Sequence, residues 1–154
     1  MATEYPAGGP PSGAPGGKTS FMNLDSNVGA MLCYIANFLC CIGLVLAIVF
    51  LVTEKENRFV KFHAWQSIFL VGLEIVLGII LEILTVILRL ALSIADLGWI
   101  AGLLTWVLGV FLLFIFFILL IIGGIKAYGG QWFKLPIIGG FAWKIVNKES
   151  STTT

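Results

Sequence analysis

The chain has 154 residues, of which 59% are hydrophobic and only 11% are charged, and its formal net charge is +1. Ordinary globular domains carry about 25% charged residues, so the composition argues against a soluble protein. The small net charge argues against nucleic acid as a partner. The three cysteines, which all lie in or beside one apolar run, form neither a disulfide framework nor a metal-binding pattern.

The N-terminal segment, residues 1–27, is predicted to be a disordered tail. It opens with MATEYPAGGPPSGAPGGKTS, which is rich in proline, glycine and alanine. Such a segment cannot bury enough apolar surface to fold. It also lacks the basic region and apolar region that mark a signal peptide. The Thr-rich end, residues 147–154, is expected to be frayed.

Three apolar spans follow, at about residues 28–52, 64–91 and 97–125. Each exceeds the roughly 20 residues that a helix needs to cross a 30 Å hydrocarbon core. The sequence therefore predicts an all-α integral membrane protein, with three transmembrane helices in one helical domain over residues 28–146. The second span would also fit two shorter helices lying in the interface, because its polar residues form a stripe.

The basic residues divide unequally between the two sides that three crossings would define. Basic residues that flank membrane helices favour the cytoplasmic side. The loop at residues 53–63 and the C-terminus are therefore predicted to be cytoplasmic, and the N-terminus outside. The side of the loop and the C-terminus carries Lys55, Arg58, Lys61, Lys126, Lys134, Lys144 and Lys148, and the other side carries Lys18 and Arg89.

The segment after the third span, residues 126–146, alternates aromatic and lysine residues and is punctuated by glycine pairs. Aromatic rings and lysines together suit the headgroup layer of a membrane. The segment is predicted to lie at the interface, where its lysines would attract anionic lipid.

The polar residues of the second span fall on one side of a helix. On a helical wheel they lie within about one third of the circumference. Because lipid penalises such a stripe, it should face protein or water. Three interpretations stay open: a packing seam, a path for a substrate, ion or proton, and a helix lying in the membrane plane. The stripe consists of His63, Ser67, Glu74, Glu82, Thr85 and Arg89.

Glu74 lies closest to the middle of the bilayer, at roughly 15 Å beyond Ala64. No basic residue lies at this depth within one chain. Because an ionised, unpaired carboxylate would be very costly there, Glu74 should be protonated, face water or meet a group from another subunit.

The first span carries a stripe of small residues on one side of the predicted helix. Small residues allow helix backbones to approach closely in membranes. The stripe is therefore expected to pack against another helix. It consists of Gly29, Cys33, Ala36, Cys40, Gly43 and Ala47.

No catalytic or cofactor-binding pattern is present in the sequence. The single histidine is not part of a nucleophile or metal motif, and no nucleotide-binding glycine loop occurs. The sequence therefore predicts neither enzymatic activity nor a cofactor.

Two polar motifs, EKENRFVKFHAWQS (54–67) and KAYGGQWFKLPIIG (126–139), stand out from the apolar spans. Together they resemble the signatures of a family of small membrane proteins that is similar to the inner-envelope protein-import component of chloroplasts, the Tic-twenty-like group. The resemblance implies a polytopic helical membrane protein with a distant link to polypeptide translocation. The matching positions in the first motif include Glu54, Lys55, Asn57, Phe59, Lys61, His63 and Gln66.

The favoured function is that of a non-enzymatic membrane protein that acts by helix packing, or as an assembly or translocation-associated factor. The alternative is a small channel or transporter with a path along the polar stripe. The expected partners are the lipid bilayer and further copies of the chain or other membrane proteins. Because the tail has few arginine and serine residues, a plasma (inner) membrane is expected rather than a chloroplast.

Overall fold

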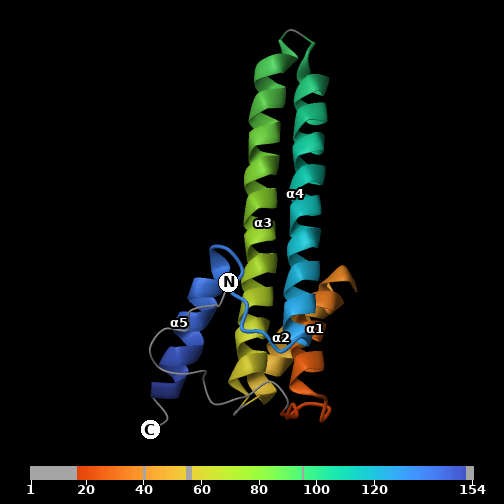
Figure 1. Ribbon diagram of the computed structural model, residues 1–154. Helices are drawn as coiled ribbons and strands as arrows, with labels where there is room; N and C mark the ends of the chain where they lie inside the picture. The colour runs from red at the N-terminus through yellow and green to blue at the C-terminus, as the bar shows by residue number, and fades with distance from the viewer. Residues whose placement is uncertain (1–16, 40, 55–56, 95, 152–154) are drawn as a thin grey trace. The chain divides into compact units, whose positions relative to one another are not determined.

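The computed structural model describes residues 17–39, 41–54, 57–94 and 96–151, and these residues are almost entirely helical (Figure 1). The predicted all-α architecture is thus confirmed at this level. The helices are α1 (Ser26–Ile35), the 3₁₀ helix η1 (Ala36–Leu39), α2 (Cys41–Thr53), α3 (Arg58–Ser93), α4 (Gly98–Tyr128) and α5 (Ile138–Ser151).

The chain divides into two compact units. The first unit is formed by residues 1–69 together with residues 120–154, and the second unit by residues 70–119. The second unit is a hairpin of two long helices, α3 and α4, which run side by side and are joined by a short turn (Figure 1).

The helices α3 and α4, of 36 and 31 residues, are long and apolar enough to cross a membrane. They correspond to the second and third predicted spans. Both exceed the roughly 20 residues that a crossing needs. Most of their large apolar side chains in the second unit are exposed, as expected of a surface in contact with lipid.

The first predicted span is not one continuous helix, so the count of three crossings is not confirmed. It is divided into α1, with 10 residues, η1, and α2, with 13 residues. At 1.5 Å per residue, α2 is only about 20 Å long, which is too short for the hydrocarbon core. Among the described residues, only α3 and α4 are helices that are both long enough and apolar enough to cross a membrane.

The break in the first span is stabilised by a side chain and a glycine. The Asn37 amide donates a hydrogen bond to the Cys33 carbonyl oxygen at 3.1 Å, which satisfies a carbonyl near the end of α1. Gly43 lies against the backbone of Ala36 and Asn37, and a Cβ placed on Gly43 would be 2.3 Å from the Asn37 nitrogen. The chain can therefore fold back on itself here, with α2 packed against α1 and η1.

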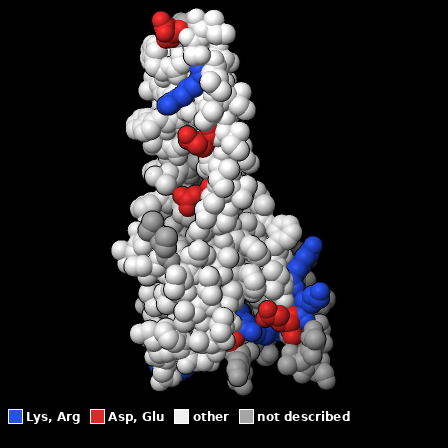
Figure 2. Space-filling view, turned by 180° about the vertical axis from the view of Figure 1, so that it is seen from behind, with Lys and Arg blue, Asp and Glu red and all other residues white. Residues whose placement is uncertain are grey.

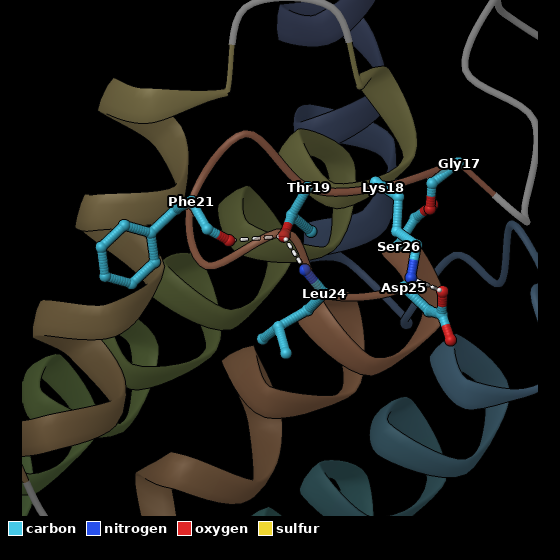
Figure 3. Close-up of polar contacts among 7 residues, drawn as sticks. All are labelled: Gly17, Lys18, Thr19, Phe21, Leu24, Asp25 and Ser26. Carbon is cyan, nitrogen blue, oxygen red and sulfur yellow. Dashed lines mark hydrogen bonds and ion pairs between the residues drawn. The ribbon is translucent and has the colours of Figure 1, made fainter.

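The described part of the predicted disordered tail, residues 17–25, is an ordered turn (Figure 3). The Thr19 hydroxyl donates to the Phe21 carbonyl oxygen at 2.5 Å and accepts from the Leu24 N–H at 3.0 Å. The ring of Phe21 packs edge-on against Phe50 of α2. Hydrogen bonds and a partly buried ring thus order this segment, although its composition is that of a tail. Residues 1–16 lie outside the described residues.

The core of the first unit joins α1, α2 and the beginning of α3. Its buried side chains are Cys33, Ala47, Phe50, Val60 and Ala64. At the other end of the chain, α5 runs to Ser151 and thus extends into the segment predicted to be frayed. Its last part is held by a hydrogen bond from Arg58 to Asn147 and an ion pair of Lys61 with Glu149.

Candidate functional site

The predicted polar stripe is divided between the two units. His63 and Ser67 belong to the first unit, where both are buried. The His63 ring makes two hydrogen bonds, one between Nδ1 and the Tyr34 hydroxyl and one between Nε2 and the Gln131 carbonyl oxygen, both at 3.1 Å. Ser67 donates to the Cys33 carbonyl oxygen at 2.5 Å. These two residues are therefore packing contacts that connect α3 with α1 and with the chain after α4.

Gln66, a residue of the first sequence motif, connects the two motifs. Its side-chain amide donates to the Phe133 carbonyl oxygen at 3.0 Å, and its oxygen accepts from the Leu135 N–H at 2.8 Å. Gln66 thus satisfies one acceptor and one donor of a segment that has no helix of its own. The two motifs that stand out in the sequence are in direct contact, although the 58 residues 68–125 lie between them.

An aromatic cluster packs beside these hydrogen bonds. The ring of Phe59 lies edge-on to His63 at 4.6 Å and to Trp132 at 5.2 Å, measured between ring centres. Phe62 contacts both Trp132 and Trp143. Rings from α3, from the segment after α4 and from α5 therefore share one core, to which the first motif contributes Phe59 and Phe62 and the second motif contributes Trp132.

Most of the predicted loop at residues 53–63 is the beginning of α3. Asn57 accepts a hydrogen bond from the Val60 N–H at 3.3 Å through its side chain, as an N-cap residue does. Glu54 is buried and accepts hydrogen bonds from the backbone N–H and the hydroxyl of Ser20. Lys55 lies outside the described residues. Glu54 and Asn57 of this motif thus serve as a contact and a cap within the first unit.

The predicted stripe of small residues lies inside the α1–α2 fold. Cys33, Ala36 and Ala47 are buried, and Gly29 faces Thr19 and Phe50. Because the chain folds back at η1, the two halves of the stripe face each other instead of a separate helix. Cys40 lies outside the described residues.

The remaining stripe residues line a groove between α3 and α4 in the second unit. The groove has a volume of about 450 Å³. Figure 2 shows acidic and basic side chains following one another along this face, among residues that carry no charge. The groove is lined by Gly78, Leu81, Glu82, Thr85 and Arg89 of α3 and by Gly102, Thr105, Trp106, Gly109, Val110 and Leu113 of α4.

Arg89 lies across the groove onto α4. A Cβ placed on Gly102 would be 2.5 Å from a guanidinium nitrogen of Arg89, whereas the Arg89 carbonyl oxygen lies beside Gly98. Because Gly102 is one helical turn further from the hairpin turn than Gly98, the guanidinium points into the groove. Gly102 thus gives the Arg89 side chain the room that it occupies.

Glu74 lines a second, apolar pocket of about 210 Å³ that is continuous with the groove, since both are lined by Gly78 and Gly109. The other side chains around Glu74 are apolar, and Phe116 of α4 is among them. Within the described part of the chain, Glu74, Glu82 and Arg89 make no ion pair and no side-chain hydrogen bond. The groove and the pocket together therefore hold three charged or chargeable groups that have no partner among the described residues.

Sequence reasoning missed Tyr34 and Asn37 as parts of these sites. Tyr34 and Asn37 lie in the first apolar span, where helical periodicity places them away from the small residues. Thr105 faces the groove and is buried, and its hydroxyl donates a hydrogen bond to the Ala101 carbonyl oxygen of its own helix at 2.8 Å.

The magnetosome magnetite crystal formation protein family (MamF/MmsF) matches residues 25–144. The chain belongs to this family. It is 40% identical over 127 residues to a UPF0132 membrane protein of Methanocaldococcus jannaschii, which covers 82% of this chain and 92% of that protein. A UPF0132 membrane protein of Archaeoglobus fulgidus is 33% identical over 119 residues, with 77% and 93% covered. No solved structure shows significant similarity to the chain.

Membership of the MamF/MmsF family corrects the expected likeness to the chloroplast import group, which is wrong. The family match covers both polar motifs and the spans between them, and the archaeal relatives are named as UPF0132 membrane proteins. The motifs that suggested the likeness are two packing partners in the first unit, connected by Gln66 and the aromatic cluster. The expected link to polypeptide translocation rested on that likeness alone and is therefore withdrawn.

Proposed function

We propose that the chain is a non-enzymatic, multi-pass protein of the plasma membrane that acts as an assembly factor, through helix packing within the bilayer. The observation that carries this proposal is the groove with the apolar pocket that continues it, where Glu82, Arg89 and Glu74 have no partner among the described residues. Lipid penalises such groups, so a membrane protein that exposes them has a surface suited to another protein. The name of the family refers to magnetite crystal formation, whereas the archaeal relatives are named only as membrane proteins. We propose a location in the membrane for this chain, but no role in forming a mineral.

Contacts of the first unit support one orientation of the chain in the membrane. Ser20, just before α1, donates hydrogen bonds to Glu54, just after α2. A single crossing between these residues would hold them about 30 Å apart. The α1–α2 segment therefore enters and leaves the membrane on one side, as a re-entrant element whose exposed apolar side chains include Phe38, Leu39, Ile42 and Val45.

In this arrangement the N-terminus, the loop at 54–57 and the C-terminus share the cytoplasmic side. The contacts of Arg58 and Lys61 with α5 agree, because they bring the C-terminal helix to the beginning of α3. The cytoplasmic side then carries Lys18 in addition to the seven basic residues named above, and the other side, with the hairpin turn, carries only Arg89. The charge asymmetry is therefore greater than three crossings would give, as orientation by basic residues favours.

Water access along α3 tests the assembly role. Single cysteines placed at Glu82, Thr85 and Arg89 of the full chain should be protected from a membrane-impermeant thiol reagent on both sides of the membrane. Cysteines at Ile83 and Val86, which are exposed outside the groove, are the matched controls for a lipid environment. Labelling at the groove positions alone would contradict the proposal.

The second candidate is a small channel or transporter. The observation in its favour is that Glu82, Thr85 and Arg89 line one continuous groove with Thr105. In that case water would reach the groove positions from at least one side, and the thiol reagent would label them in a pattern that follows the groove. The same experiment therefore decides between the two functions.

A further inference from the structure

The charged side chains that line the groove of the second unit have no partner of opposite charge among the described residues. Glu82 and Arg89 are both exposed along the α3–α4 hairpin. They are seven residues apart on α3, outside the three- or four-residue spacing at which side chains of one helix pair. The guanidinium of Arg89 has moved across to Gly102 of α4. A partner for this groove must therefore supply an acid near Arg89 and a base near Glu82.

We infer that the partner is a second copy of this chain, packed groove to groove. Copies in one membrane share their orientation, so a two-fold axis along the membrane normal brings equal depths together. In such a dimer Arg89 of each copy can pair with Glu82 of the other. This inference rests on the proposed function, since it names the partner of the same groove.

The depths of the two groups agree with this pairing. The Arg89 guanidinium lies at the level of Gly102, one turn into the groove and beside Thr85. Glu82 lies three residues further along α3, which is about 4.5 Å. A glutamate side chain spans this distance. The pairing is reciprocal, so one contact type satisfies two carboxylates and two guanidinium groups at once.

The groove also has room for a second helix pair. A Cβ placed on Gly78 would meet no atom within 4 Å, although Gly78 lines the groove. Gly109, on the facing side of α4, is also a lining residue. A glycine that is open in this way, as Gly78 is, allows the backbone of a neighbouring helix to approach closely in a membrane. The space is empty within one copy and would be filled by the other.

Charge reversal with two distinguishable copies tests the pairing between chains. Glu82→Arg alone and Arg89→Glu alone each place like charges across the interface, and each should lower the dimer fraction about tenfold or more. Co-expression of the Glu82→Arg chain with the Arg89→Glu chain should restore the mixed dimer, because every acid then faces a base. The measurement is single-molecule photobleaching, or energy transfer between two labels, in liposomes.

A pair of glycine variants provides a test that does not change the charge. Gly72 and Gly78 both lie on α3, and a Cβ meets nothing within 4 Å at either position, but only Gly78 lines the groove. Gly78→Leu should lower the dimer fraction about tenfold, while Gly72→Leu leaves it unchanged. Equal effects of the two variants, or mixed charge-reversed chains that stay apart, would overturn the inference.

The outcomes also separate the dimer from the proposed function. A wild-type monomer in liposomes whose groove is protected from thiol reagents would refute the dimer and leave an assembly role with another membrane protein. A monomer with a labelled groove would refute both. A dimer that persists in all charge-reversed variants would show that the copies associate elsewhere, and the groove-to-groove inference would fail.

Discussion

At the scale of single residues, Gln66 holds together segments that are far apart in the sequence. Its amide group pairs with the backbone of both Phe133 and Leu135, in the way a neighbouring strand would pair with an extended segment. A side chain can do this only if it is buried beside the segment, and Gln66 is fully buried. The segment between α4 and α5 therefore depends on one side chain for two of its backbone bonds.

We expect Gln66→Leu to destabilise the first unit strongly. The change keeps an apolar stem of similar length but leaves one buried carbonyl and one N–H unpaired, at about 1–3 kcal/mol each. Gln131→Leu is the control, because the Gln131 side chain is exposed and such a change should stay within about 0.5 kcal/mol. Thermal unfolding in detergent, followed by tryptophan fluorescence, measures both, and equal midpoints would contradict the role of Gln66.

Glu74 gives a prediction about insertion. It lies half-buried among apolar side chains of both helices of the hairpin, including Phe116. Glu74→Gln keeps the size and hydrogen-bonding capacity, so the chain should accumulate in membranes as before. Glu74→Lys places a cation there, at a cost of about 3 kcal/mol on insertion scales, and should reduce accumulation sharply. Quantitative immunoblots of membrane fractions give the comparison, and similar levels of the two variants would show that Glu74 faces water.

At the scale of elements, the same substitution should have opposite effects in two helices. Gly43→Ala in α2 would place a Cβ 2.1 Å from the Asn37 side-chain oxygen and 2.3 Å from the Asn37 nitrogen. The overpacking cost of about 1–3 kcal/mol or more exceeds the roughly 1 kcal/mol that alanine gains over glycine in a helix. We therefore expect Gly43→Ala to lower the unfolding temperature.

Gly140→Ala in α5 provides the opposite case. A Cβ placed on Gly140 meets no atom within 4 Å. Only the helix propensity then changes, and the variant should be more stable by about 0.5–1 kcal/mol. Thermal unfolding of both variants in the same detergent checks the pair. A shift in the same direction for both would mean that the close approach of Gly43 to η1 is not a constraint in the folded protein.

The elements also show what the sequence could and could not predict. Length and hydropathy suffice for α3 and α4, because a long apolar run has one stable backbone form in lipid. The first span has the same composition, but its break depends on Asn37 bonding to Cys33 and on Gly43 packing against Ala36. These contacts join different segments of the folded chain, and helical periodicity in the sequence cannot predict them.

The polar stripe illustrates the same limit for the candidate site. Periodicity placed His63, Ser67 and Glu82 on one side of a helix, and all of them do belong to α3. It could not tell that His63 and Ser67 have buried partners in α1 and near Gln131, while Glu82 lines an open groove. The difference arises from the segments that pack against each turn of α3, and the periodicity of a single helix gives no information about those segments.

At the scale of the whole molecule, the two-crossing arrangement predicts the location of the chain ends. Reporters fused to the N-terminus and after Asn147 should both be cytoplasmic, and a reporter inserted at Asp96 should be outside. The basis is the contact of Ser20 with Glu54 and the charge asymmetry. An N-terminal reporter on the outer side would restore the three-crossing arrangement and exclude the re-entrant one.

The division of the first unit into two pieces of sequence has a consequence for biosynthesis. Its contacts join residues on both sides of the hairpin, as in the hydrogen bonds of His63 with Gln131 and of Arg58 with Val146. The ribosome makes residues 70–119 between these pieces, so α3 and α4 must leave the ribosome before the partners of Arg58 and His63 exist. Until then, the polar groups of residues 57–67 lack these partners. A chain that stalls before α5 would therefore present an integrated hairpin with an open first unit, a form that quality-control proteases could distinguish from the finished protein.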